Sequence, residues 1–492
     1  MPPSSPEAQE VDAFSDLLQK DFRIAKSDGP KLTSLISNLA VAVLDNLNEY
    51  FPGTAAETIT SLIARIDRIL SDQMNEVLHC EKLRRVEGTW RGLHFLVINT
   101  ETDQKLKIRV LNIKKSELSK TLQDYDGSMW DRSPVFDLIY TREYATLGGV
   151  PFGAIIGAYE FSHAADDVAL LRNMSGIAAA AHAPFIAAAS PRLFGFDGWI
   201  ELPNPRDLKL IQSSPDYAAW QSLRQSEDSR YIGLTMPRML ARPTYGAATF
   251  PVDGFDFEET THALPDNYIW MNAAFAMGVN INRSYKQYGW GARIRGFESG
   301  GAVTDLPVDT SPIDNPPHSM VGPTEVSIDD RREAELSKLG LIPLLQRKNT
   351  SSAAFIGVGS LQDREARVAL LADPDAQSNE RLLANLPHLL AVSRFAQYLK
   401  VIARDKIGAF SERSDLQSHL NEWISQYVLN DPTVADDKQR AKRPLASAEI
   451  QIDRSETRPG YYTARFFLRP YYQLEGTTVS LRLVSELLTG ER

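Results

Sequence analysis

The sequence predicts a mixed α/β (α+β) protein of several domains, with a helical N-terminal segment, an α/β core and a β-rich C-terminal part. Its 492 residues exceed the size that a single hydrophobic core supports. Apolar residues recur at helical spacing through residues 1–80, and after residue 90 short apolar runs alternate with helical stretches. The hydrophobic content of 43% and the charged content of 24% are those of an ordinary folded protein.

Composition excludes several classes of protein. The only cysteine, Cys80, allows no disulfide framework and no multi-thiolate metal site within one chain, which indicates a reducing compartment. The first residues carry no basic stretch followed by an apolar one, and no run reaches the roughly 20 apolar residues that span a bilayer. We therefore expect no signal peptide and no membrane insertion. A formal charge of −10 argues against nucleic acid as a partner.

Three helices are predicted before residue 80. The second covers residues 32–47, and the third starts at Thr54 with capping-box spacing and runs to Leu78. The first ends at Gly29 and carries four apolar residues that could anchor it in a groove: Phe14, Leu17, Leu18 and Phe22. Residues 1–80 hold 12 acidic and 6 basic side chains. Because apolar-striped helices do not make a core alone, we expect this segment to pack on something else.

The middle of the chain is expected to alternate strands with helices. A helix is predicted over residues 164–181, a Gly/Pro-rich loop over 300–323, and a further helix from Asp329. Six runs are expected as strands: GLHFLVINT (92–100), LKIRVLNI (106–113), FDLIYT (136–141), FGAIIGAYE (152–160), PFIAAAS (184–190) and YIGLTMP (231–237).

The C-terminal part is predicted to hold two helices, over 386–410 and 415–429, followed by strands with one buried face. Apolar and polar residues alternate over 448–453 and again over 462–468. In the last strand Val479, Leu481 and Leu483 alternate with polar residues. Its backbone edge is therefore available either to its own sheet or to the sheet of a neighbouring subunit.

Patterns that carry chemistry are weak. The sequence contains no P-loop, HExxH, CxxC or G-x-S-x-G pattern. His163 with Asp166 and Asp167 admits metal or acid–base chemistry, but acidic residues at a helix N-terminus are the favoured interpretation. We expect no catalytic, cofactor-binding or metal-ligating residues.

Two clusters are candidate interfaces. Tyr288 and Trp290 lie in an aromatic, arginine-rich stretch that indicates a core or subunit contact more than a small-molecule site. Lys400, Arg404 and Lys406 form a dense charge cluster. An ion-pair network that faces solvent or another subunit is favoured there over catalysis.

Several ordered strings resemble the large sheath subunit of the bacterial type VI secretion system, the TssC/VipB/ImpC family. They are WRGLHFLV from 90, GAYEFSH from 157, the AAAHAPFIAAASP run to 191, GLTMPRMLARPTYG from 233, YGWGARIRGFESGG from 288, PTEVSIDDRREAELSKLGLIPL from 323, RFAQYLKVIARDKIGAF from 394 and QLEGTTVSLRLVSEL from 473. They span residues 90–487.

The resemblance implies a non-enzymatic, cytoplasmic structural protein without cofactors. Its partners would be a small sheath subunit (TssB/VipA-like), an inner tube protein (Hcp-like), a recycling AAA+ ATPase (ClpV-like), baseplate components and further copies of itself in a helical polymer that contracts. It further implies that residues 1–85 pack on the small subunit and bear the ATPase-recognition helix. Residues 86–385 would then form the middle α/β sheath domains, and 386–492 a C-terminal sheath domain with a terminal strand.

Two alternatives remain at this point. One is a phage-type contractile tail sheath or a baseplate scaffold, which co-assembly with a small secretion-sheath subunit would separate from the first interpretation. The other is an α/β hydrolase-like enzyme, whose mark would be a convergent nucleophile and base.

Overall fold

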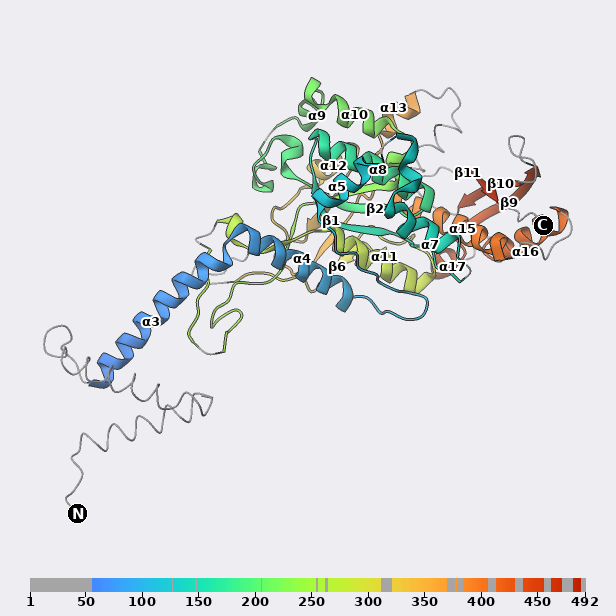
Figure 1. The fold of residues 1–492 in the computed structure, drawn as a ribbon. Coiled ribbons are helices and arrows are strands. Elements are labelled where there is room, and N and C mark those ends of the chain that lie inside the picture. Colours follow the sequence, from blue (N-terminus) through green and yellow to red (C-terminus); the bar gives the residue numbers. More distant parts are fainter. Residues whose placement is uncertain are drawn as a thin grey trace, which may run out of the picture. The chain divides into compact units, whose positions relative to one another are not determined.

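The computed structural model describes residues 55–125, 127–146, 148–204, 206–253, 255–261, 264–310, 321–369, 377, 384–405, 413–429, 437–454, 462–470 and 481–487 (Figure 1). The first two predicted helices lie outside these residues. The chain divides into two compact units, of which one comprises residues 1–78 with 245–259 and the other residues 79–244 with 260–492.

The smaller unit is organised around helix α3 (Ala55–Leu78), which confirms the third predicted helix. The side-chain amide of Asn75 donates a hydrogen bond of 3.2 Å to the carbonyl oxygen of Glu258. Within the 245–259 loop, Tyr245 forms an isolated β-bridge with Phe250. The loop is therefore tied both to the helix and to itself.

A six-stranded sheet forms the centre of the larger unit. Its strand order is β1-β2-β3-β7-β8-β6. The first four strands are parallel neighbours and the last two pair antiparallel. Their bounds are β1 (Ile155–Phe161), β2 (Phe185–Ala189), β3 (Ile232–Met236), β7 (Leu341–Gln346), β8 (Ala353–Phe355) and β6 (Ala302–Val303). The predicted strands at 152–160, 184–190 and 231–237 are thus confirmed, and every residue of β2 and β3 is buried.

Helices cover both faces of this sheet (Figure 1). Helix α8 (Ala165–Ala181), predicted over 164–181, packs on β1, β2 and β3 from one side. Helix α11 (Ala274–Tyr288) packs on the same strands from the other side, and α4 (Glu81–Ile98) packs on α11. Strands β2, β3 and β7 are consequently buried on both faces, which explains their nearly continuous apolar sequences, whereas the edge strand β1 is mostly half-buried.

Shorter elements connect these layers. They are α5 (Lys115–Gln123), η1 (Gly127–Arg132), α6 (Pro134–Phe136), η2 (Asp137–Thr141), α7 (Arg142–Tyr144), η3 (Pro191–Phe194), η4 (Trp199–Glu201), α9 (Leu208–Gln212), η5 (Pro215–Tyr217), α10 (Ala218–Gln225), η6 (Asp228–Tyr231), β4 (Met239–Leu240), η7 (Pro265–Asn267), β5 (Trp270–Met271), α12 (Asp330–Lys338) and α13 (Arg364–Ala369).

The C-terminal part is a three-stranded antiparallel sheet in the order β11-β10-β9 with helices against it. The strands are β9 (Leu445–Arg454), β10 (Tyr462–Pro470) and β11 (Leu481–Leu487), and the helices are α15 (Leu386–Asp405), α16 (Arg413–Ser425) and α17 (Asp437–Lys442). Ile450, Ile452, Ala464, Phe466 and Leu468 form the buried face of β9 and β10. The predicted alternation of these strands is confirmed.

Three expected strands are wrong. Residues 92–98 continue helix α4, because Gly88, Gly92 and Leu96 place one helical face against the body. Residues 136–141 form a short helical stretch with π-type hydrogen bonding. Residues 106–113 are extended, and buried and exposed side chains alternate only over 106–109; the segment joins no sheet among the described residues. A short apolar run does not by itself distinguish strand from buried helix.

Candidate functional site: the assembly surfaces

Helix α4 has an unusual distribution of residues, because small residues face inward and large apolar residues face outward. A Cβ atom on Gly88 would lie 2.2 Å from the carbonyl oxygen of Trp270, and one on Gly92 would lie 2.3 Å from the ring of Phe275. Only glycine permits this approach. The inner face of α4 is therefore closely packed against the body and offers no room for larger side chains.

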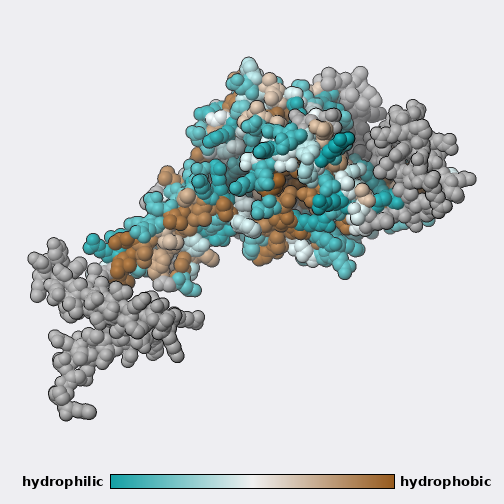
Figure 2. Space-filling model, viewed as in Figure 1, coloured by the Kyte–Doolittle hydropathy of each residue, from teal (hydrophilic) through white to brown (hydrophobic). Residues whose placement is uncertain are grey.

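The outer face of α4 carries an apolar stripe. Leu83, Val86, Trp90 and Val97 fall at helical spacing opposite the two glycines, and all four are exposed, Trp90 to 64%. Figure 2 shows an apolar area on the body where α4 ends. Between the two faces, the carboxylate of Glu87 accepts hydrogen bonds of 2.7 Å from Arg91 and from buried Arg242. An exposed apolar stripe that contains a tryptophan is typical of a protein contact surface.

Helix α3, in the smaller unit, carries a second stripe. Its exposed apolar residues recur every three or four positions, namely Ile63, Ile66, Leu70, Met74 and Val77. This spacing is that of a seam that receives another helix. Figure 2 shows apolar side chains along α3. The sequence pattern predicts that this helix packs on something else. It does not predict the outer face of α4, because the apolar run at 92–100 resembles a strand.

The predicted interface residue Trp290 lies in the core. It is 4% exposed, and its ring stacks on Phe395 of α15 with centroids 4.1 Å apart. Its indole N–H donates a hydrogen bond of 3.2 Å to the carbonyl oxygen of Lys442. Tyr288 is half-buried beside the guanidinium of Arg293. Trp290 thus joins the segment after α11 to the C-terminal layer within one chain.

The charged residues of α15 also contact their own chain. The ammonium group of Lys400 lies 5.6 Å from the ring centroid of Tyr144 and 5.8 Å from that of Tyr140, and burial lowers the pKa of Lys400 to about 8. Arg404 donates hydrogen bonds of 2.9 Å to the carbonyl oxygens of Tyr144 and Thr146. Lys406 lies outside the described residues. Through these contacts Lys400 and Arg404 attach α15 to the end of α7.

Gln397 also attaches α15 to the rest of the chain. The sequence did not single it out. Its amide nitrogen donates to the carbonyl oxygens of Phe152, Ala181 and His182 at 2.7, 3.1 and 2.8 Å. Arg394, one turn earlier, donates to the side-chain oxygen of Gln397 at 2.8 Å. A buried glutamine looks like any polar helix residue in a sequence, and only the fold shows that three carbonyls converge on it.

Charged residues at the carboxyl end of the parallel strands pair with one another. Arg238 donates two hydrogen bonds of 2.8 Å to the carboxylate of Glu325. Burial raises the pKa of Glu160 on β1, which lies near both. The carboxylate of Asp167 accepts from Ser162 at the start of α8 and pairs with Lys115 at 2.6 Å. These contacts match the helix-terminus interpretation, and among the described residues no three His, Cys, Asp or Glu side chains could hold a metal ion.

The last strand, β11, pairs antiparallel with β10 in its own chain. Leu481 lies opposite Leu468 and Leu483 opposite Phe466. Val479 lies outside the described residues. β11 is an edge strand of the three-stranded sheet, so only one of its backbone edges is used within that sheet.

Comparisons with known proteins show the family to which the chain belongs. Residues 60–362 match the family described as EvpB/VC_A0108, tail sheath N-terminal domain, and residues 375–487 match the EvpB/VC_A0108 tail sheath gpW/gp25-like domain. The chain is also 51% identical over 482 residues to the type VI secretion system sheath protein TssC1 of Pseudomonas aeruginosa PAO1, covering 97% of this chain and 96% of that protein. The sheath tail protein of Desulfitobacterium hafniense aligns structurally with a TM-score of 0.31 and 10% identity, over 67% of this chain and 56% of its own.

The two domain matches define a tail sheath protein. Within that class, the chain belongs to the TssC/VipB family of type VI secretion sheath large subunits. No helix in the described parts of the chain is long and apolar enough to cross a membrane.

Proposed function

We propose that this chain pairs with a small sheath subunit and that the pairs polymerise into a helical tube around an inner tube. The tube contracts, drives the inner tube outward from the cytoplasm through a baseplate, and is then dismantled by an AAA+ ATPase. The observation that carries this proposal is the outward apolar face of α4, because its inner face is already filled. The seam on α3 supports it independently.

Co-expression with the small subunit tests the proposal. We expect a stable complex and tubes visible by negative-stain microscopy. Trp90→Ser should weaken the complex by tenfold or more, since exposed tryptophans at interfaces are frequent hot spots. Ile200→Ser is a matched control, because Ile200 is 57% exposed but lies on η4 and belongs to neither stripe. Equal binding by the Trp90 variant and the wild type would contradict the role of α4.

The N-terminal helix with Phe14, Leu17, Leu18 and Phe22 is proposed as the element that the ATPase recognises. Short amphipathic helices bind grooves through such anchors. Replacing Phe14 and Leu18 by Ser should abolish ATPase binding and leave tubes intact. Loss of the tubes as well would show that the helix is structural.

The terminal strand is proposed to connect neighbouring subunits. The hydrogen bonds that join β11 to β10 are made by backbone atoms, so β11 of one subunit can make them with β10 of another. Such a connection keeps subunits together while they rotate. Deleting residues 477–492 should leave a soluble complex with the small subunit that forms no tubes. Long tubes from the truncated chain would refute the connection, and failure to fold would assign β11 to its own sheet.

A further inference from the structure

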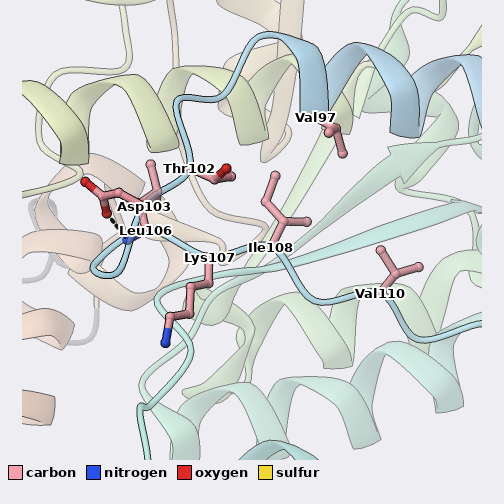
Figure 3. Close-up of a pocket in the computed structure, with 7 residues that line it drawn as sticks. All are labelled: Val97, Thr102, Asp103, Leu106, Lys107, Ile108 and Val110. Atoms are coloured by element: carbon pink, nitrogen blue, oxygen red, sulfur yellow. Dashed lines mark hydrogen bonds between the residues drawn. The ribbon is translucent and has the colours of Figure 1, made fainter.

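The segment Lys107–Asn112 is an extended stretch whose backbone is unused. Leu106 is buried and Ile108 partly buried, whereas Lys107 and Arg109 are exposed, so the side chains alternate as in a strand over 106–109. Val110, Leu111 and Asn112 are all exposed. Figure 3 shows Ile108 and Lys107 pointing to opposite sides. Among the described residues, no backbone N–H or C=O group of 107–112 makes a hydrogen bond.

Both ends of this segment are held in place. Before it, the carboxylate of Asp103 accepts hydrogen bonds from the backbone of Leu106 at 2.8 Å and from Lys286 of α11 at 2.7 Å. After it, the hydroxyl of Tyr159 on β1 donates to the carbonyl oxygen of Ile113 at 2.7 Å. In the middle, Arg109 is paired with Glu143. The segment is therefore positioned before any partner arrives, which lowers the entropic cost of pairing with it.

A groove with both apolar and polar lining residues accompanies the segment. It has a volume of about 420 Å³ and is lined by Val97, Thr102, Asp103, Leu106, Lys107, Ile108 and Val110. Val97, at the end of α4, points toward the segment (Figure 3), and Val110 is 63% exposed. The groove thus continues the outer stripe of α4, and side chains of an added strand would find apolar contacts there.

The positive charge of the segment restricts which kind of strand can pair with it. Residues 104–115 contain five basic residues and no acidic one, in a chain whose formal charge is −10. Arg109 and Lys115 pair with Glu143 and Asp167, so Lys105, Lys107 and Lys114 supply the positive charge that a partner would meet. Two copies of the segment would repel each other if they paired, because like charges opposite one another destabilise a sheet. The complement is a strand with acidic side chains.

We propose that Lys107–Asn112 accepts an acidic β-strand from the small subunit with which this chain assembles. The strand adds to the free backbone edge and places apolar side chains in the groove beside Val97 and Val110. This inference rests on the proposed function, which supplies the partner, and it goes beyond it by naming where and how that partner pairs.

Hydrogen–deuterium exchange on the full chain in assembled tubes tests this inference. The amides of 107–112 should exchange at least tenfold more slowly in tubes than in the chain without the small subunit, and in alternation, because every second N–H of a strand faces the partner. Tubes in which these amides exchange as fast as in the free chain would overturn the inference and leave the proposed function standing. Absence of any complex would overturn both.

Proline substitutions give a second, independent readout. Successive N–H groups point to opposite sides of an extended chain, so Val110→Pro and Leu111→Pro each remove one, and neither breaks a bond within the described chain. One variant should lose co-assembly by tenfold or more while the other resembles the wild type. Equal behaviour of the two, whether both assemble or both fail, would refute backbone pairing.

Charge reversal tests the acidic character of the partner. Lys107→Glu should weaken the complex, and the loss should diminish at high salt, whereas Lys120→Glu on α5 serves as the control, because Lys120 is equally exposed but lies outside the segment. No difference between the two variants would refute an acidic strand. Cross-linking from position 107 to another copy of this chain would refute the small subunit as the origin of the added strand.

Discussion

Helices α4 and α15 are similar in length and use their apolar residues in opposite ways. In α15, large apolar residues such as Val392 and Phe395 face the core, and Gln397, Lys400 and Arg404 tie the helix to its own chain. In α4, glycines face the core and Trp90 faces outward. The comparison teaches that an assembly surface is recognised by what is left over after a helix has packed, and not by the hydrophobicity of its sequence.

Two tryptophans give the largest expected contrast. Trp290→Ala should lower the free energy of unfolding by about 3–5 kcal/mol, because it leaves a cavity against Phe395. Trp90→Ala should change it by less than about 0.5 kcal/mol, because the side chain is exposed. Chemical denaturation of both variants checks this. Similar losses would remove the distinction between the two helices.

The buried amine of α15 should make stability depend on pH. Below pH 8 Lys400 is protonated in both states and its burial cost is present in full. Between about pH 8 and its ordinary pKa of 10.5, the native amine loses its proton and the unfolded one keeps it, so stability rises with pH. Lys400→Met should abolish this rise, which the size of the shift puts at about 3 kcal/mol. Parallel pH profiles of variant and wild type would show that Lys400 is not responsible.

The glycine face of α4 should tolerate no side chain. Gly88→Ala should destabilise the chain by about 1–2 kcal/mol, because overpacking against the carbonyl of Trp270 exceeds the gain in helix propensity. Gly176→Ala in α8 is the control, since nothing lies within 4 Å of its Cβ position and the helix should gain up to about 1 kcal/mol. Thermal unfolding midpoints of the two variants should move in opposite directions.

The smallest effect on stability is expected on the outer face of α4. Val86→Ser should leave the free energy of unfolding within about 0.5 kcal/mol of the wild type, whereas the same change at buried Val392 on α15 should cost several times more. Only Val86→Ser should weaken the complex with the small subunit while the fold remains intact. A loss of stability at Val86 would indicate that this face packs within the chain.

Sequence patterns predicted β2 and β3 because these strands are buried on both faces and carry apolar runs flanked by turns. Strand β7 is buried in the same way but was not predicted. The alternation of β9 and β10 was equally readable, since one face of that sheet packs on α15 and α16. The run at 92–98 was wrongly predicted as a strand, because an apolar stretch with Gly92 resembles a strand when the segments that pack against it are unknown. The run at 106–113 is extended as predicted, but its side chains alternate only over 106–109 and it pairs with no strand among the described residues.

The residues alone were sufficient to predict the mixed α/β class, the amphipathic third helix and, through resemblance, the sheath family. These follow from local periodicity and from short strings that can be recognised without knowledge of the tertiary structure. Only the tertiary structure decided that Trp290 is a core residue, that Gln397 binds three carbonyls, and that the outer face of α4 is free. Burial is a property of pairs of segments far apart in the chain, so no single stretch contains the information on which of its faces is already occupied.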